Sequence, residues 1–276
     1  LILFFVFRNS ADYEYQANDD GVIIGKYTGK ETVVEIPEQL KGKMVISLSG
    51  TFSSYKELTE VTIPNGITEI GENTFYGCEN LKSISLPDSV TKIGKNAFAG
   101  CTGLKDIKLP NGIQTIDESA FEDCSSIQSI TLSENLSSVG TNAFRNCSAL
   151  TSLTFPNSIK EIKENAFYNC SSLKEVKLPD GVVTIGASAF ANCGEIETIS
   201  LTAEATSSID ESAFDKSVEL KVTDYEYEIE GNSITIKKYT GMESVIEIPD
   251  KTGSSEGGND QMAALIKRVI GVEMVK

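Results

Sequence analysis

The chain has 276 residues with 40 acidic and 24 basic side chains, which gives a net charge of −16 and an isoelectric point near 4.5. Nucleic acids and anionic membranes attract clustered lysine and arginine, so this balance argues against both as partners. The sequence has no histidine, and no apolar run reaches the 18 residues of a transmembrane helix candidate. We therefore predict no transmembrane segment in this chain and no catalysis that depends on histidine.

Residues 1–11 begin with seven consecutive apolar residues, Leu1 to Phe7, followed by Arg8. This pattern is typical of the end of the apolar region of a secretory signal, with Ser10 and Ala11 near a cleavage site. The alternative is an ordinary hydrophobic first strand. We interpret residues 1–11 as a possible signal-peptide remnant.

Residues 12–57 are predicted to form the N-terminal cap of a repeat array. Two alternating segments, Tyr13–Tyr15 and Val22–Tyr27, flank the turn sequence Asn18-Asp19-Asp20-Gly21, which favours a β-hairpin. The segment from Glu31 to Glu57 keeps the phase of the repeats that follow, so we interpret it as a degenerate first coil. An array needs ends that cover its core, which is the role we assign to this region.

Residues 58–219 contain seven copies of one 23-residue pattern. It reads L-x-x-I-x-L-P-x-x-V-x-x-I-G-x-x-A-F-x-x-C-x-x, and its copies begin at Leu58, Leu81, Leu104, Ile127, Leu150, Leu173 and Ile196. A period of 20–29 residues that opens with L-x-x-L-x-L is typical of a leucine-rich repeat. The alternation around Ile84 and Leu86 predicts a short strand, which Pro87 ends. The spacing of A-F-x-x-C predicts a short helical or 3₁₀ arc.

The repeats predict the fold because a single coil buries too little apolar surface to offset the entropy of ordering 23 residues. Neighbouring coils must therefore stack. We predict a right-handed leucine-rich-repeat solenoid with a parallel strand ladder on one face, short helical or 3₁₀ arcs on the other, and β-hairpin-like caps. Stacking should align seven phenylalanines into one internal spine: Phe75, Phe98, Phe121, Phe144, Phe167, Phe190 and Phe214.

The six cysteines all occupy the same position of the pattern, so their side chains should point the same way in adjacent coils. A disulfide needs two Cβ atoms that face each other, and parallel side chains do not meet that geometry. The spacing also lacks the short C-x-x-C pairs of a zinc site. We predict six buried, reduced thiols and no metal site.

Beyond the repeats, residues 220–250 contain a second copy of the N-terminal module sequence. Tyr225 to Pro249 aligns without gaps to Tyr13 to Pro37, with 13 of 25 positions identical. We interpret this segment as a C-terminal cap, and as a sign that the parent protein is a longer array of such modules. Residues 251–276 are predicted to form a Gly/Ser/Asp-rich linker and a short amphipathic tail.

The repeat resembles the BspA-like class of bacterial leucine-rich repeats, with LKSISLPDSVTKIGKNAFAGC a near-ideal copy. The resemblance covers residues 31 to about 219, and the Y-T-G and E-I-P segments of the opening module also look like that class. It implies a secreted or surface-attached repeat protein, with adhesion or binding to macromolecules as its activity. It implies no catalytic residues and no cofactor.

The candidate binding surface is the solvent-facing side of the predicted strands, at pattern positions two, three and five. Over seven coils this strip carries five lysines and four acidic residues, about +1 in a chain of −16. A partner could therefore approach there. The alternative is that polar side chains only keep the face soluble. The candidate contact residues are Lys82, Lys105, Asp106, Lys108, Lys174, Glu175 and Lys177.

These observations favour a monomeric, non-catalytic scaffold, secreted or at the cell surface, that binds a protein or another macromolecular partner. Acidic clusters lie at outward positions and are best explained as a solvated surface. The alternative function is a carbohydrate-binding module. Sugar sites use exposed aromatic side chains, and the predicted strand-face positions have none. The outward tyrosines, Tyr76 and Tyr168, are four coils apart.

Overall fold

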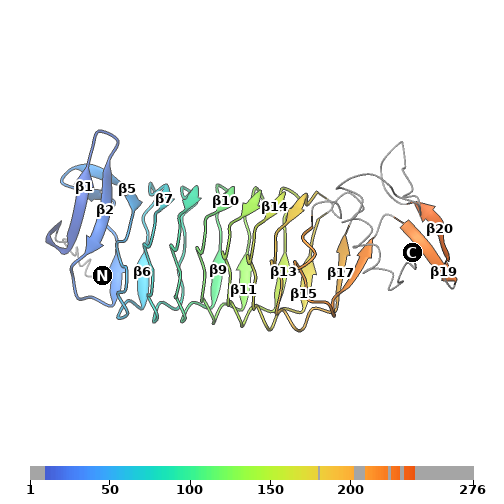
Figure 1. Ribbon diagram of the computed structural model, residues 1–276. Coiled ribbons are helices and arrows are strands. Elements are labelled where there is room, and N and C mark those ends of the chain that lie inside the picture. Colours follow the sequence, from blue (N-terminus) through green and yellow to red (C-terminus); the bar gives the residue numbers. More distant parts are fainter. Residues whose placement is uncertain (1–9, 180, 202–208, 223–224, 231–232, 240–276) are drawn as a thin grey trace, which may run out of the picture.

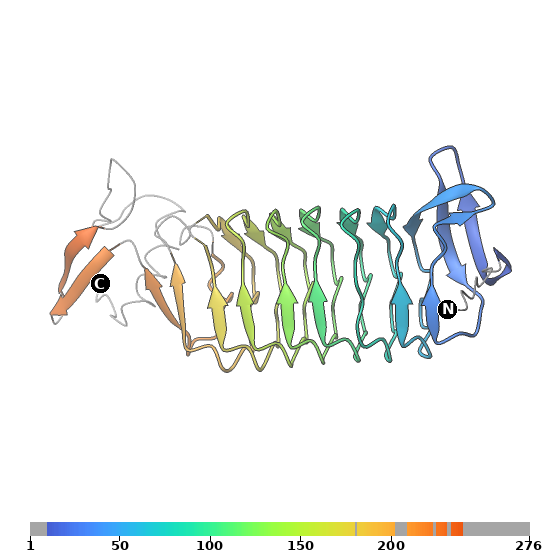
Figure 2. The same ribbon diagram turned by 180° about the vertical axis from the view of Figure 1, so that it is seen from behind.

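The computed structural model describes residues 10–179, 181–201, 209–222, 225–230 and 233–239. Stacked coils form an elongated solenoid with a hairpin at its N-terminal end (Figures 1 and 2). Most of the predicted signal remnant and the whole of the predicted linker and tail lie outside the described residues. No helix among the described residues is both long and apolar enough to cross a membrane.

The strand predicted from L-x-x-I-x-L is confirmed, and its copies form what we call the first ladder. Its strands are β3 (Val33–Glu35), β6 (Glu60–Thr62), β9 (Asp106–Lys108), β11 (Ser129–Thr131), β13 (Ser152–Thr154), β15 (Glu175–Lys177), β17 (Thr198–Leu201) and β18 (Glu219–Val222). They pair in parallel as β3 with β6, β9 with β11, β13 with β15, and β17 with β18. The coil that begins at Leu81 joins this ladder through a bridge between Ser85 and Thr62 and through backbone hydrogen bonds of Lys82 to Thr59 and Lys105.

A second parallel ladder runs along the V-x-x-I-G segments, where only the far-side connection of each coil was predicted. Its strands are β7 (Glu69–Ile70), β8 (Lys92–Ile93), β10 (Thr115–Ile116), β12 (Ser138–Val139), β14 (Glu161–Ile162) and β16 (Thr184–Ile185). They continue into β5 (Lys43–Leu48), β2 (Val22–Tyr27) and β1 (Tyr13–Ala17), while β4 (Gln39–Leu40) pairs with β5. The expectation of a ladder on one face alone is thus corrected. Two-residue strands exist because stacking brings the same backbone groups of each coil into register.

The predicted helical arcs are wrong: among the described residues the only helix is the 3₁₀ turn η1 (Ser10–Asp12). In the coil that begins at Leu81, Asn96 (φ 54°) and Gly100 (φ 74°) have left-handed backbones. A right-handed helix needs consecutive residues at negative φ, so these two positions interrupt it. Left-handed residues occupy the same two positions in the first six regular coils: Asn73, Asn96, Ser119, Asn142, Asn165 and Ser188, and Gly77, Gly100, Asp123, Asn146, Asn169 and Asn192.

The backbone of each arc bonds to the next coil instead of forming a helix. The N–H groups of Asn96, Phe98 and Gly100 donate to carbonyls of the following coil at 3.1, 2.7 and 2.8 Å. The N–H groups between them close local turns, as from Ala99 to Asn96 at 3.1 Å. Alternate donors therefore hold neighbouring coils together, and each arc is a chain of turns.

The phenylalanine spine is confirmed and is the centre of the core. Phe121 lies 5.0 Å from both Phe98 and Phe144, measured between ring centroids, with planes 2° and 1° apart. The same stacking continues from Phe52, in the degenerate first coil, to Phe214. All these rings are buried.

The six cysteines are free and buried, as predicted. Each Sγ donates to the carbonyl of the phenylalanine 26 residues earlier, as from Cys101 to Phe75 at 3.1 Å. The same bond recurs for Cys78, Cys124, Cys147, Cys170 and Cys193. A buried carbonyl needs a donor, and the thiol supplies one within a small apolar volume.

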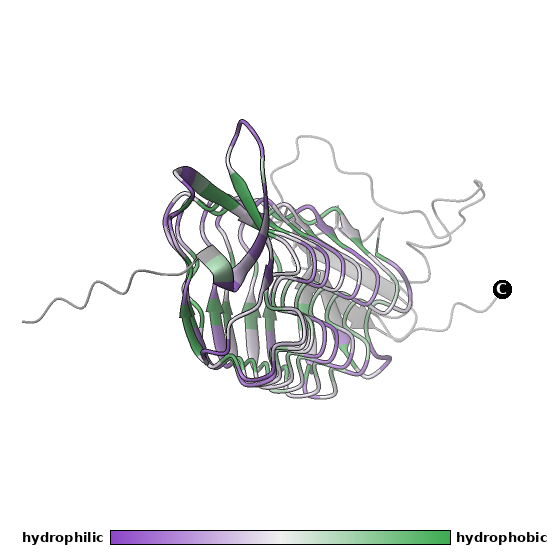
Figure 3. Ribbon diagram, turned by 90° about the vertical axis from the view of Figure 1, so that its left-hand side faces the viewer, coloured by the Kyte–Doolittle hydropathy of each residue, from purple (hydrophilic) through white to green (hydrophobic). Residues whose placement is uncertain are grey.

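The predicted N-terminal hairpin is formed by β1 and β2, and β2 pairs in parallel with β5. Tyr27 packs against Phe52 with ring centroids 5.3 Å apart, so the hairpin covers the end of the spine. Figure 3 shows this end, where the hairpin rises beside the stacked coils.

The second copy of the N-terminal module sequence also forms a hairpin, β19 (Tyr225–Glu230) and β20 (Ser233–Tyr239). Tyr225 pairs with Tyr239 as Tyr13 pairs with Tyr27, and both hairpins have a bulge after the following glutamate. Within the described part of the chain, β19 and β20 form a sheet of their own. The role of this segment as a C-terminal cap stays a prediction.

Candidate interaction surfaces

The seven predicted contact residues are all exposed, and they lie along the solvent side of the first ladder, which we call the strand face. Stacking places equivalent residues side by side: the N–H of Lys105 donates to the carbonyl of Lys82 at 3.3 Å. In β9 and β15 the outer residues are exposed and the central residue is buried. Lys105 and Lys108 therefore lie beside Lys82, whereas Lys174 and Lys177 lie three coils further along.

The structure separates these lysines by their partners. Lys174 forms an ion pair with Glu195 at 2.9 Å, and Lys177 forms one with Glu175 at 3.0 Å. Asp106 accepts a hydrogen bond from the hydroxyl of Ser129 at 2.6 Å.

Lys82, Lys105 and Lys108 have no carboxylate oxygen within 4.0 Å among the residues that the structure describes. The uncompensated positive charge of the strand face is thus concentrated in the coils that begin at Leu81 and Leu104. The sequence alone gave the two groups of lysines equal weight.

A second surface, which sequence reasoning missed, is a cleft of about 850 Å³ on the outer side of the second ladder. We call it the trough. Residues from β1, β2, β5, β7 and β8 line it, and Asp117 follows β10. Glycine and serine occupy five of its lining positions: Gly25, Ser47, Ser49, Gly71 and Gly94. Because these side chains are so small, the strand backbones form its base.

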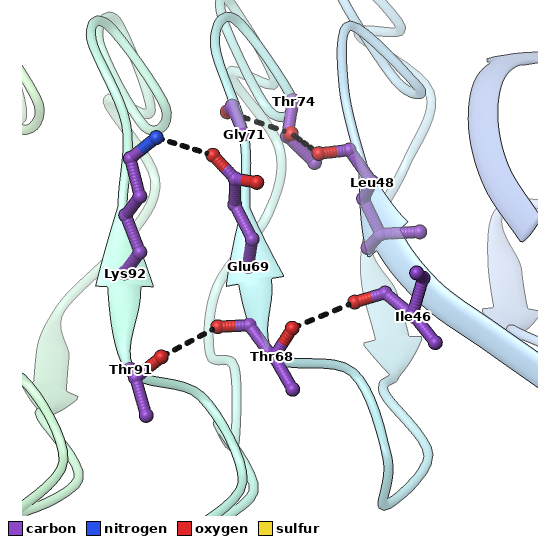
Figure 4. A network of polar contacts seen from close by, with 8 residues as sticks. All are labelled: Ile46, Leu48, Thr68, Glu69, Gly71, Thr74, Thr91 and Lys92. Carbon is purple, nitrogen blue, oxygen red and sulfur yellow. Dashed lines mark hydrogen bonds and ion pairs between the residues drawn. The ribbon is translucent and has the colours of Figure 1, made fainter. Parts of the chain in front are cut away.

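The base of the trough is held by a network of polar contacts (Figure 4). Lys92 and Glu69 form an ion pair at 2.7 Å across adjacent strands. The hydrogen bond that the Lys92 ammonium donates to Glu69 raises the pKa of that ammonium, which therefore stays charged. The hydroxyl of Thr74 donates to the carbonyls of Leu48 and Gly71 at 3.0 and 2.8 Å.

Close approach of the coils leaves little room for a side chain at Gly71 and Gly94, whereas Asp117 and Lys163 occupy the same pattern position in other coils. A Cβ on Gly71 would lie 2.5 Å from the Leu48 carbonyl oxygen, and one on Gly94 would lie 3.0 Å from backbone atoms of the preceding coil. The repeated dipeptide was the available sequence signal for this surface. It did not reveal that the N-terminal hairpin contributes to the same trough.

Neither surface has the arrangement of a catalytic site. Within the described residues, no three acidic or cysteine side chains converge as metal ligands would. The nucleophilic candidates are the cysteines, but burial raises the pKa of the Cys124 and Cys147 thiols above the ordinary value. A buried, protonated thiol is inert.

The profile of the family described as BspA type leucine-rich repeat region (6 copies) matches residues 48–152 and 137–252. Among solved structures, the T. pallidum leucine-rich repeat protein TpLRR is 32% identical, with a TM-score of 0.53 over 70% of this chain and 85% of that one. A leucine-rich repeat protein from Eubacterium ventriosum is 26% identical, with a TM-score of 0.56 over 67% of this chain and 51% of that one. A leucine-rich repeat protein from Bacteroides ovatus shares the fold; it is 20% identical, with a TM-score of 0.54 over 77% of this chain and 78% of that one.

Two curated relatives are each described as a component of the A-type ATP synthase. The Methanosphaera stadtmanae protein is 59% identical over 44 residues, which are 15% of this chain and 42% of that protein. The Methanothermobacter thermautotrophicus protein is 72% identical over 32 residues, which are 12% and 30% of the two chains. The chain thus spans less than half of either protein.

Proposed function

Since this chain belongs to the BspA-type leucine-rich repeat family, we propose that it is a non-catalytic scaffold, secreted or at the cell surface, that binds a protein partner as a monomer. Family membership and the repeat fold support the scaffold role. A solenoid offers a long, regular surface on which successive coils place equivalent side chains side by side. Such a surface suits recognition of an extended partner.

The observation that carries the proposal is the position of the uncompensated lysines. Lys82, Lys105 and Lys108 lie together in a chain of net charge −16, and none of them forms an ion pair with another described residue. A partner that approaches elsewhere meets a predominantly acidic surface, whereas an acidic segment is attracted here. We place the centre of the contact at these three residues, with Asp106 between them. Lys174, Glu175 and Lys177 lie toward the edge because their charges are already paired.

Charge reversal tests this assignment. Extracellular proteins would first be captured on the purified solenoid, and poly-glutamate would serve as a defined acidic probe. We expect Lys82→Glu, Lys105→Glu and Lys108→Glu together to slow association and to reduce its salt dependence, since charges near an interface chiefly set the association rate. Lys160→Glu, Lys163→Glu and Lys216→Glu form the charge control, because these exposed lysines lie off the strand face; Lys163 is 3.7 Å from Glu161, whereas the three lysines reversed on the strand face are not paired with a described carboxylate.

Equal losses in both sets would show that only overall charge matters, and a loss in the control alone would move the site to another surface. Location is tested separately, by fractionation of the native cells. Recovery in the medium or on the cell surface is expected, and recovery only inside the cells would contradict that part of the proposal.

A further inference from the structure

The trough is a cleft of about 850 Å³, and the strand-face proposal does not use it. It lies on the second ladder, and its lining residues include none of the strand-face lysines. It is also polar, with Tyr15 and Ile23 the only large apolar residues among those that line it.

The shape of the trough suits a chain-like ligand. Its lining crosses β1, β2, β5, β7 and β8 and ends at Asp117, just after β10, and these six strands are consecutive in the sheet. Five steps of about 4.8 Å give a length of roughly 24 Å. A chain laid across the strands would meet a new set of side chains at each step, a spacing about the length of one sugar unit.

The charges of the trough exclude an anionic ligand. Four carboxylates and two ammonium groups line it: Glu14, Glu69, Glu72, Asp117, Lys92 and Lys95. Lys92 is engaged with Glu69 at 2.7 Å, and Lys95 with Glu118 at 2.9 Å. The ammonium groups are therefore already neutralised. A phosphate or sulfate would meet the remaining carboxylates without a free cation.

An extended peptide fits the base of the trough less well than a sugar chain does. The N–H groups of Gly71 and Gly94 donate to carbonyls of Leu48 and Ile70 at 2.6 and 2.8 Å. Backbone groups at the base are thus used within the sheet, and a peptide could not add to it as a further strand. Hydroxyl groups both donate and accept, so a neutral polyol can bond to carboxylates, amides and engaged ammonium groups alike.

The trough has an aromatic residue in its lining, whereas the strand-face positions have none. Tyr15, half-buried in β1, lines the trough together with the amide of Gln16. The ammonium of Lys41 lies 5.9 Å from the centroid of the Tyr15 ring and contributes to its placement. The small residues of the base allow a flat sugar ring to approach the backbone closely.

We propose that the trough binds a neutral oligosaccharide chain, laid across the strands from Tyr15 toward Asp117. This is a second binding site, separate from the strand face and independent of the protein partner proposed for it. The ligand class follows from the length of the trough, its polar lining, its excess of carboxylates and its aromatic end.

The test uses the full chain and a substitution that fills the trough. A Cβ on Gly25 would meet only the Glu14 carbonyl oxygen, at 3.7 Å, and Gly25 is not among the left-handed glycines. Gly25→Leu should therefore fold and block the trough. Gly194→Leu is the matched control, because a Cβ there meets nothing within 4 Å and the residue lies outside the trough. The probes are oligomers of glucose, N-acetylglucosamine, xylose and mannose, with oligolysine and a sulfated oligosaccharide for comparison.

We expect at least one neutral oligomer to bind, with at least tenfold weaker binding to Gly25→Leu and unchanged binding to Gly194→Leu and to the triple strand-face variant. Asp117→Ala removes one half-buried acceptor without filling the trough, and should weaken binding severalfold even if Gly25→Leu does not fold. The proposal is overturned if no neutral oligomer binds, if both trough variants bind as wild type does, or if oligolysine binds in preference to every sugar. Loss of binding in the strand-face variant alone would also overturn it, by moving the sugar to that surface.

Discussion

Replacing Phe121 with alanine should remove the middle of the aromatic spine. The ring is fully buried and stacks at 5.0 Å on Phe98 and on Phe144, in the two adjacent coils. Truncation of a buried phenylalanine to alanine costs about 3–5 kcal/mol, and each aromatic contact accounts for about 0.5–1.5 kcal/mol beyond area burial. We expect a value near the upper end of that range, because two ring contacts are lost.

The assay is urea unfolding followed by far-ultraviolet circular dichroism. In a solenoid each coil is stabilised mainly by its neighbours, so a weak coil in the middle can uncouple the two halves. The midpoint should therefore fall, and the transition should broaden or split. Phe121→Leu keeps most of the volume but loses both ring contacts, so it should cost about 1–3 kcal/mol, less than Phe121→Ala.

Tyr76→Ala is the surface control, since that ring is 46% exposed. A Phe121→Ala midpoint equal to that of wild type, or to that of Tyr76→Ala, would refute the conclusion that the spine holds the coils together.

Three further predictions concern single positions. Burial raises the pKa of Cys124, so its protonated form stabilises the folded state fully below the unfolded thiol pKa, near 8.5. That stability is lost as pH rises above this value, at up to about 1.4 kcal/mol per pH unit. The free energy of unfolding of Cys124→Ala should therefore fall less steeply than that of wild type between pH 8.5 and 10.5. Equal slopes for the two proteins would contradict this. Gly140→Ala should destabilise by about 1–3 kcal/mol in urea unfolding, because its Cβ would lie 2.6 Å from the Ile116 carbonyl oxygen, whereas Gly194→Ala should be neutral. Asn96 has a φ of 54°, so Asn96→Ala should lower the free energy of unfolding by about 1–2 kcal/mol, and Asn96→Gly should lower it by less. Equal melting temperatures for these two variants would argue against the left-handed turn.

The 23-residue period was enough to determine the coil and its inward face. Because each coil repeats the last, a residue that is buried in one copy is buried in its neighbours, which is why the positions of Phe98 and Cys101 could be assigned from spacing alone. The parallel strand at Ile107 followed from the alternation of apolar and polar residues. The hairpin at 13–27 followed from its turn sequence.

The arcs and the second ladder could not be predicted in this way. Asn96 and Gly100 are compatible with helix ends as well as with left-handed turns, and only the bonds to the next coil select the turns. A two-residue strand such as Lys92–Ile93 has no detectable propensity of its own. Its hydrogen bonds exist only when the coils are stacked.

The two surfaces were likewise decided by tertiary structure. Lys174 and Lys105 occupy the same pattern position, yet among the residues that the structure describes only Lys174 has a carboxylate, from Glu195, within ion-pair distance. The trough joins Tyr15 to Asp117 across more than one hundred residues of sequence. Burial repeats with the sequence pattern because every coil presents the same apolar face to the same core, whereas charge pairing and clefts depend on which outward side chains meet after the coils have stacked.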